Sequence, residues 1–164
     1  MTKKERSKLG IISEYTFCKT DGNNQEFHNL CMQLDDALNQ MVGKKQQEKN
    51  YNQLNQLNEI HDVILIYDGT TAIGCGAYKL YDEETVEIKR VFVKNEYRGK
   101  GLAKELIRRL EADARIKGFR FAVLETGRPM LEAQALYKKS GYKEIPNYGP
   151  YADLPNSVCM SKKI

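Results

Sequence analysis

A glycine-containing turn between an expected strand and an expected helix carries the clearest chemistry in this sequence. The strand is Val86–Val93, a run of β-branched and aromatic residues, and a helical pattern follows the turn. Such a turn directs unpaired backbone N–H groups and the positive end of the helix dipole at one place. Gly99 and Gly101 let a ligand approach the backbone closely, and Arg98 and Lys100 add positive charge. The segment therefore predicts a phosphate or pyrophosphate site, although its spacing fits neither a dinucleotide fingerprint nor a phosphate loop.

Two short motifs resemble those of a known family. Arg98-x-x-Gly101-x-Ala103, preceded by the strand Val91-Phe92-Val93, resembles the [Gln/Arg]-x-x-Gly-x-[Gly/Ala] signature of the GNAT superfamily of N-acetyltransferases. Residues 133–142 resemble the family's A-x-x-x-Y-x-x-x-G-[F/Y] segment, and the two motifs occur in the family's order and at its distance. The resemblance covers the chain well from about residue 60 to the C-terminus, and the residues before that point only loosely.

The resemblance implies a fold and a cofactor. The fold is α/β, an α+β mixed sheet with helices on both faces, in which the strand Val86–Val93 and the strand after the long helix splay apart. The gap admits the pantetheine arm of acetyl-CoA, and the turn amides hold its pyrophosphate. The cofactor contacts expected on this basis are Val91, Phe92, Val93, Arg98, Gly99, Lys100, Gly101, Leu102 and Ala103.

Transfer of an acetyl group from a thioester to an amine needs a base for the amine, stabilisation of the oxyanion and a proton for the leaving thiolate. Neither a nucleophilic cysteine nor a metal is needed if the amine attacks directly. Tyr137 matches the family position whose hydroxyl faces the CoA sulfur and serves as general acid. Without the resemblance, a tyrosine at this helical spacing would be interpreted as a core residue.

Glu87 is the candidate for the base. It lies eleven residues before Arg98, a position that holds a catalytic glutamate in some members of the family. Strand alternation places Glu87, Lys89 and Val91 on one face. The alternative role for this carboxylate is a salt bridge with Lys89 or Arg90.

Lys89 and Arg90 are unusual in the middle of an apolar strand, because charged side chains are rarely buried unpaired. Either they pair with an acid such as Glu125, or one of them binds an anionic group of the substrate. The loop of residues 146–151 would border the acceptor pocket in the implied fold, and Tyr148 and Tyr151 would then wall a small substrate.

The segments 87–90, 124–127 and 146–151 also resemble a bacterial subgroup of mostly uncharacterised small-molecule acetyltransferases. The leading hypothesis is therefore an acetyl-CoA-dependent N-acetyltransferase for a small amine, one that can carry a carboxylate. A protein lysine or N-terminal acetyltransferase is the nearest alternative. A non-catalytic CoA-binding module is a third, which the presence of Tyr137 and Glu87 disfavours.

Periodicity gives the order of elements along a single domain, residues 1–164. We expect a flexible tail at 1–8, a strand within 9–18, an amphipathic helix from 27 to about 43, and a short helix or ordered loop within 44–58. The later elements expected are strands at 63–67, 72–80, 86–93, 119–125 and 157–160, a long helix from 102 to 118 and a short helix at 130–137.

Composition limits the remaining possibilities. The chain has 41% hydrophobic and 29% charged residues and a net charge of +4, which indicates a globular protein with a lysine-rich surface and no nucleic-acid partner. Four widely spaced cysteines and two histidines argue against a metal site and a disulfide framework. With no apolar run long enough for a membrane span or a signal peptide, we expect a cytoplasmic location. The implied fold also allows a homodimer through a sheet edge.

Overall fold

The protein is described by a computed structural model that covers residues 2–43, 57 and 59–164. The helix or loop expected within residues 44–58 therefore lies, apart from residue 57, outside the described residues. The helices are α1 (Lys3–Ile12), α2 (Gln25–Val42), α4 (Leu102–Ile116) and α5 (Leu131–Lys139), with single 3-10 turns at Asn95–Tyr97 and Gly149–Tyr151. The strands are β1 (Thr16–Thr20), β2 (Asp62–Asp68), β3 (Thr71–Leu80), β4 (Thr85–Val93), β5 (Phe121–Gly127), β6 (Lys143–Ile145) and β7 (Ser157–Lys163).

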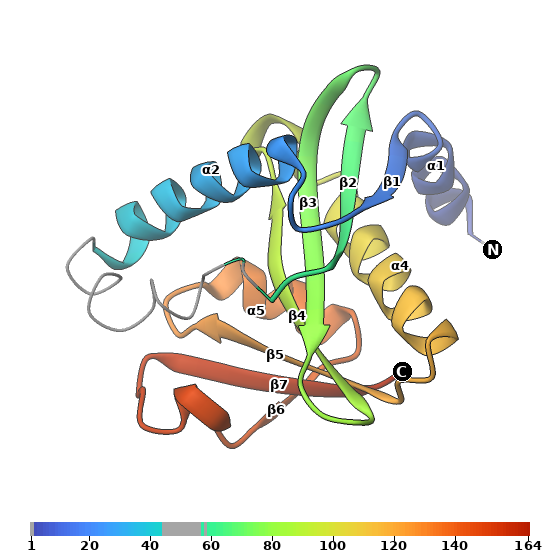
Figure 1. Cartoon of the computed structure of the whole chain (residues 1–164). Coiled ribbons are helices and arrows are strands. Elements are labelled where there is room, and N and C mark those ends of the chain that lie inside the picture. Colours follow the sequence, from blue (N-terminus) through green and yellow to red (C-terminus); the bar gives the residue numbers. More distant parts are fainter. Residues whose placement is uncertain (1, 44–56, 58) are drawn as a thin grey trace.

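The described strands form one seven-stranded mixed sheet in the order β1-β2-β3-β4-β5-β7-β6. All neighbours are antiparallel except β4 and β5, which are parallel and are connected through α4. The expected mixed sheet and its strand–helix–strand crossover are thus confirmed. Figure 1 shows the long strands β3 and β4 at the centre of the molecule and the shorter β5–β7 group at an angle to them.

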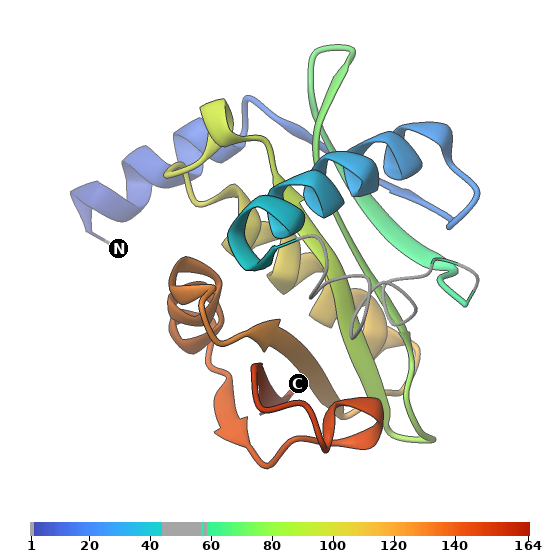
Figure 2. The ribbon, with the colours of Figure 1, turned by 90° about the vertical axis from the view of Figure 1, so that its left-hand side faces the viewer.

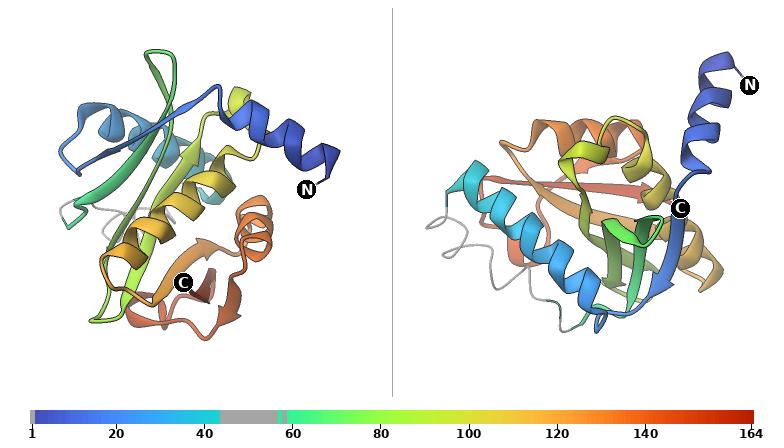
Figure 3. Two further views of the ribbon diagram at one scale, coloured as in Figure 1. Left: turned by 90° about the vertical axis from the view of Figure 1, so that its right-hand side faces the viewer. Right: turned by 90° about the horizontal axis from the view of Figure 1, so that it is seen from above.

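Helices cover both faces of the sheet. In Figure 2 and in the right-hand view of Figure 3, α2 lies on one face of β2–β4, and α4 lies on the opposite face. Each face has its own cluster of buried apolar side chains. The α2-side cluster includes Phe27, Leu65 and Phe92, and the α4-side cluster includes Leu106 and Leu124. The helices are therefore held by the apolar stripes that their 3–4 spacing predicts.

Helix α4 packs closely on β3 because a glycine lies under it. A Cβ atom at Gly76 would come within 2.8 Å of Leu106 Cδ2 and 3.0 Å of Leu110 Cδ1. A glycine inside a strand often marks a close approach of another element, and at Gly76 that element is α4.

The expectation of a strand beginning at Leu9 is wrong. Residues 3–12 form α1, into which most of the expected tail falls, and the strand begins only at Thr16. The sequence signal was a capping box: Thr2 N donates to Glu5 Oε2 at 2.5 Å, and Glu5 N donates to Thr2 Oγ1 at 3.2 Å. In both views of Figure 3, α1 projects from the body of the molecule.

The sequence also gave no sign of β6. Its three residues pair with β7 from Lys143↔Ser161 to Ile145↔Cys159, and β7 runs to Lys163 rather than to Met160. No helix in the described part of the chain is long and apolar enough to cross a membrane.

Replacement of Leu106 by alanine tests the packing of α4. Its side chain is fully buried, so we expect the free energy of unfolding to fall by about 2–5 kcal/mol, as for other large-to-small core substitutions. Leu131→Ala, at a position that is 71% exposed, is the matched control and should change it by less than about 0.5 kcal/mol. Urea unfolding measures the free energy of unfolding of both variants, and an equal decrease in the two would contradict this assignment of the core.

Candidate active site

The parallel strands β4 and β5 stay paired for only a short distance. Their register consists of three residue pairs, from Thr85↔Phe121 to Glu87↔Val123, although β4 continues to Val93 and β5 to Gly127. Beyond Glu87 the two strands diverge, and their facing backbone groups are not bonded to each other. This is the splayed gap that the family resemblance implies.

A β-bulge at Arg90 changes which side chains of β4 face which helix. Arg90 has φ of 57°, and the register with β3 shifts between Cys75↔Phe92 and Ala77↔Lys89. Arg90 points to α2 and Phe92 joins the α2-side cluster, whereas Val91 packs against the α4-side cluster. The expectation that Glu87, Lys89 and Val91 share one face is therefore wrong for Val91, because the bulge inserts one extra residue before it.

The turn before α4 has the geometry of an anion site. Gly99 and Gly101 have φ of 78° and 81°, a conformation that favours glycine, and Gly101 is the N-cap of α4. The first α-helical bond runs from Glu105 N to Gly101 O, so the N–H groups of residues 102–104 are not used inside the helix. Since no side chain among the described residues caps this end, these N–H groups are available to a phosphate.

The two basic residues of the turn have partners within the protein. Arg98 Nε donates to Val93 O at 2.9 Å, and its guanidinium lies 5.9 Å from the Phe92 ring centre, so the turn is fixed to the end of β4. Lys100 Nζ is 3.1 Å from Tyr15 Oη and lies near the Tyr15 and Tyr97 rings. Arg98 thus holds the turn in place, while Lys100 connects it to the segment before β1.

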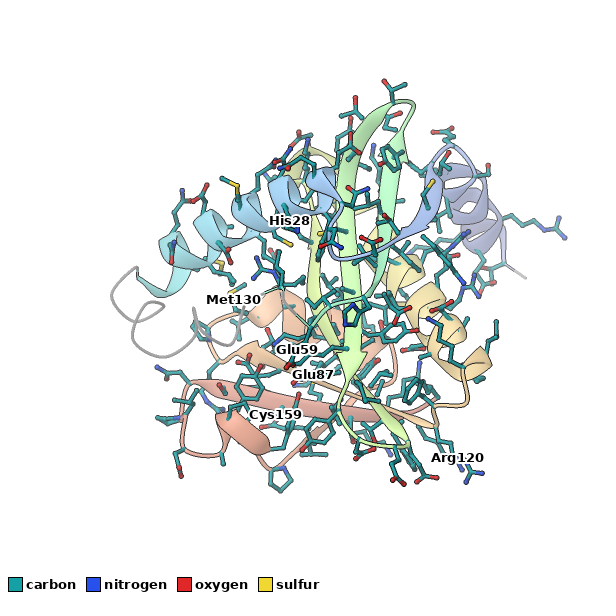
Figure 4. All side chains as sticks on the ribbon, viewed as in Figure 1. His28, Glu59, Glu87, Arg120, Met130 and Cys159 are labelled. Atoms are coloured by element: carbon teal, nitrogen blue, oxygen red, sulfur yellow. The ribbon has the colours of Figure 1, made fainter. Side chains whose placement is uncertain are left out.

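Two neighbouring cavities follow the gap, and α5 borders both. The first is lined by residues 87–91 of β4, residues 125–127 of β5, Tyr137 and Tyr151. The second is lined by the turn before α4 and by Leu136 of α5. The structure therefore brings the expected catalytic residues to one end of the gap and the expected pyrophosphate turn to the other. In Figure 4, Glu87 and Met130, which line the first cavity, come from β4 and from the turn before α5.

Tyr137 lies near the end of α5 and is 8% exposed. Its ring meets Tyr142 edge-to-face, with centres 5.9 Å apart. Burial, and secondarily the charge of Glu125, raises the pKa of Tyr137, so the hydroxyl stays protonated at neutral pH. A buried, protonated hydroxyl at the gap is suited to donate a proton.

Glu87 is a buried carboxylate with partners on both oxygens. Tyr148 Oη donates to Oε2 at 2.5 Å, and Oε1 lies 3.7 Å from Lys89 Nζ and 3.9 Å from Lys79 Nζ. The salt bridge that was the alternative to a catalytic role is therefore present. These partners fix the orientation of the carboxylate at the mouth of the gap.

Glu125 is the carboxylate whose environment most changes its chemistry. It lies on β5 opposite Cys159 of β7 and lines the first cavity. Burial raises the pKa of Glu125 to about 7, against the opposing effects of a hydrogen bond from Ser157 and the charge of Lys89. The sequence predicted Glu125 as a partner for the basic residues and as a substrate-binding residue, but not as a base, because the degree of burial that sets its pKa is not visible in the sequence.

Lys89 and Tyr151 line the first cavity, and two further tyrosines pack in a row beside Tyr151. Lys89 Nζ is 3.2 Å from Tyr151 Oη, and burial lowers the pKa of Lys89. Tyr148 packs edge-to-face on Tyr151 at 5.5 Å and on Tyr81 at 5.1 Å. Tyr151 therefore lines the first cavity, whereas Tyr148 packs on Tyr151, and Tyr81 on Tyr148, without being among the lining residues, so a pocket role for Tyr148 stays a prediction.

Arg90 has partners that the sequence did not indicate, both from α2. Its NH1 lies 2.9 Å from Asp35 Oδ1, and its NH2 donates to Cys31 O at 2.8 Å. Glu125, the expected partner, is instead close enough to Lys89 to influence the pKa of Lys89. The two adjacent cations of β4 are therefore stabilised by different elements.

The fold and the turn together define a CoA-dependent acyltransferase domain. The chain belongs to the acetyltransferase (GNAT) family, whose model matches residues 27–142. It is 37% identical over 95 residues to the IAA acetyltransferase of Azospirillum brasilense and 32% identical over 100 residues to the uncharacterized N-acetyltransferase YsnE of Bacillus subtilis. These matches cover 57% and 60% of this chain, and the chain spans only 62% and 66% of the lengths of the two relatives.

Solved structures agree with this assignment. A candidate acyl-CoA N-acyltransferase from Klebsiella pneumoniae is 31% identical, with a TM-score of 0.73 over 91% of this chain and 97% of that chain. The PaiA N-acetyltransferase of Thermoplasma acidophilum, solved in complex with coenzyme A, has a TM-score of 0.70 at 20% identity over 92% of this chain and 99% of that chain. At that identity the likeness shows the fold alone.

A matched pair of glycine substitutions tests the anion turn. Gly101 and Gly118 lie at opposite ends of α4, both with positive φ and with no atom near the position of a Cβ. Each alanine variant should lose about 1–2 kcal/mol of stability from backbone strain. Only Gly101→Ala should also weaken acetyl-CoA binding, by about tenfold, because it distorts the N–H groups at the helix start. Calorimetric titration with acetyl-CoA measures this, and equal affinity of both variants would contradict the turn assignment.

Proposed function

We propose that this protein transfers the acetyl group of acetyl-CoA to the amine of a small molecule that also carries a carboxylate. The observation that carries the proposal is the convergence of Tyr137 and Glu125 on one cavity at the point where β4 and β5 diverge. The anion turn at the other end of the same gap gives the reaction its donor site.

The residues present fit the donor. The free N–H groups at the start of α4, with Gly99, Lys100 and Gly101 around them, would hold the pyrophosphate. The diverging backbone of β4 at Val91 and Val93 would hold the pantetheine arm. Acetyl-CoA supplies an acetyl group already activated as a thioester, so the protein needs to position the amine and move two protons.

Glu125 is the proposed proton acceptor. Its carboxylate has a pKa of about 7, so near neutral pH it is ionised in a large share of molecules and basic enough to take a proton from an ammonium group. Tyr137 Oη is the proposed donor to the leaving group, since it lines the cavity and carries a proton at neutral pH. Glu87 is the other candidate for the base, but its partners Tyr148, Lys89 and Lys79 favour a positioning role.

The charges of the first cavity favour a small acceptor over a protein. Lys89 and Arg90 line the cavity together with Glu87 and Glu125, and the two cations offer a substrate carboxylate an attraction that a basic peptide lacks. A protein acetyltransferase and a non-catalytic CoA-binding module remain the alternatives, and the second is disfavoured by the buried Tyr137 and Glu125 at the gap.

We further propose a cytoplasmic location. All four cysteines are unpaired thiols in the structure, as in proteins of reducing compartments. Pairing of two copies through a sheet edge remains a proposal without a defined surface.

Removal of the Tyr137 hydroxyl tests the proton donor. Tyr137→Phe should lower kcat by about a hundredfold or more while leaving the Kd for acetyl-CoA nearly unchanged, because the hydroxyl acts only as the leaving group departs. Tyr142→Phe, at its edge-to-face neighbour, is the matched control and should retain activity. Steady-state kinetics would refute the donor role if both variants kept the wild-type kcat.

The pH profile tests the proton acceptor. In the wild type, kcat/KM should rise with pH through about 7, because Glu125 cannot accept a proton until it is ionised. An acceptor whose own amine titrates far above this range must be used. Glu125→Gln should lower the rate and abolish this rise, whereas Glu87→Gln should keep it. Loss of the rise in Glu87→Gln alone would instead identify Glu87 as the base.

A further inference from the structure

Four side chains beside the first cavity contact one another in a closed network. Tyr148 Oη donates to Glu87 Oε2 at 2.5 Å, and Glu87 Oε1 lies 3.7 Å from Lys89 Nζ. Lys89 Nζ lies 3.2 Å from Tyr151 Oη, and the Tyr151 ring meets the Tyr148 ring with centres 5.5 Å apart. Figure 2 shows the 3-10 turn that contains Tyr151 close to β4. This four-residue network therefore joins the loop before β7 to the strand at which the gap opens.

The hydrogen bond from Tyr148 fixes which oxygen of Glu87 faces the lysines. Glu87 is 4% exposed, so its charge must be stabilised by partners within the fold. Burial, and secondarily the charge of Glu87, raises the pKa of Tyr148, so the phenol keeps its proton and is the donor. Because Tyr148 bonds Oε2, the other oxygen is the one turned to Lys89 and Lys79. Charge-assisted hydrogen bonds of this kind hold a defined geometry.

Tyr148 is the member of the network that lies behind the cavity wall. Glu87, Lys89 and Tyr151 are among the described residues that line the first cavity, and Tyr148 is not. Its hydroxyl is directed to Glu87. A change at that hydroxyl can therefore affect a molecule in the cavity only through the residues that it holds.

The backbone hydrogen bonds in the middle of this loop are local. The N–H groups of three residues donate to carbonyls of the loop itself, namely those of Tyr151, Ala152 and Leu154. Further along, Arg128 N donates to Asn156 O at 2.7 Å and ties the end of the loop to the segment after β5. The side-chain contacts with β4 are thus what joins the middle of the loop, and with it Tyr151, to the central strand.

We propose that Tyr148 is a positioning residue for the substrate amine: its bond to Glu87 holds the loop of residues 146–156 on β4 and sets the places of Lys89 and Tyr151 in the cavity. The inference rests on the proposed function and deepens it, because it gives Tyr148 a role in substrate binding without contact with the substrate. A wall that is fixed before the amine arrives lowers the entropic cost of binding it. Donor binding should not depend on this bond, since the anion turn lines the other cavity.

Removal of the Tyr148 hydroxyl tests this role. In Tyr148→Phe, KM for the amine should rise by about five- to twentyfold, while kcat changes by less than about threefold and the Kd for acetyl-CoA by less than about twofold. The probe is the amine with the highest wild-type kcat/KM in a panel of amino acids, polyamines, aminoglycosides and lysine peptides, with thiol release as the assay. An unchanged KM in Tyr148→Phe would overturn the inference.

The matched control is Tyr81→Phe. Tyr81 is the outer ring of the same row, and its ring centre lies 5.1 Å from that of Tyr148. The substitution removes a hydroxyl but keeps the ring contact, so this variant should retain the wild-type KM. An equal rise of KM in both variants would show that the effect does not come from the bond to Glu87, and would also overturn the inference.

A double-mutant cycle distinguishes positioning from direct contact with the substrate. Glu87→Leu removes the oxygens that receive the Tyr148 bond. If Tyr148 acts through Glu87, the addition of Tyr148→Phe to Glu87→Leu should change KM by less than about twofold. A further rise as large as the one in the wild-type background would mean that Tyr148 contacts the amine itself, and would contradict the positioning role.

Hydrogen exchange tests the hold on the loop without any substrate. In Tyr148→Phe, the backbone N–H groups of residues 151–157 should exchange about fivefold faster or more, whereas those of α4 should be unchanged. Equal exchange of the loop in the variant and the wild type would overturn the inference. Absence of transfer to every amine, with acetyl-CoA bound, would instead contradict the proposed function, and the exchange rates would still decide whether Tyr148 holds the loop.

Discussion

The divergence of β4 from β5 is the constraint on which the rest of the site depends. Parallel strands require a crossover, and here the crossover helix α4 begins just past the end of β4. The unused N–H groups of that helix therefore lie at one end of the gap that the strands open. The next helix along the chain, α5, follows β5 and borders the same gap with Tyr137. One topological feature thus aligns the proposed anion turn, the diverging backbone and the proposed proton donor.

The bulge in β4 adds the second constraint, which concerns the acceptor end. A non-glycine residue with positive φ costs on the order of 1 kcal/mol, and Arg90 adopts it within the central strand. The bulge lets both Lys89 and Arg90 leave the α4-side core, and the bonds of Arg90 to α2 offset part of the strain. Buried ionic groups of this kind contribute little to stability on balance, so their presence favours a functional explanation.

How far the sequence could predict this site depends on the kind of signal. The two motifs located the anion turn and Tyr137, and periodicity located α2, α4 and the strands β2–β5, because these features depend on local patterns. The bulge at Arg90 was not predictable, since a one-residue shift of register leaves no mark in composition. Its partner Asp35 comes from a helix far away in the chain, and the raised pKa of Glu125 depends on burial that only the assembled fold creates. The capping box of α1, by contrast, was visible in Thr2-x-x-Glu5 and was overlooked.

The measurement that most directly tests the central claim is thiol release from acetyl-CoA across a panel of acceptors that includes amino acids, polyamines, aminoglycosides and lysine peptides. We expect release that depends on a small amine bearing a carboxylate, together with a matching acetylated product. Release with lysine peptides alone would instead establish a protein acetyltransferase. Tight binding of acetyl-CoA without transfer to any acceptor would contradict the proposed acetyltransferase activity and leave a CoA-binding module.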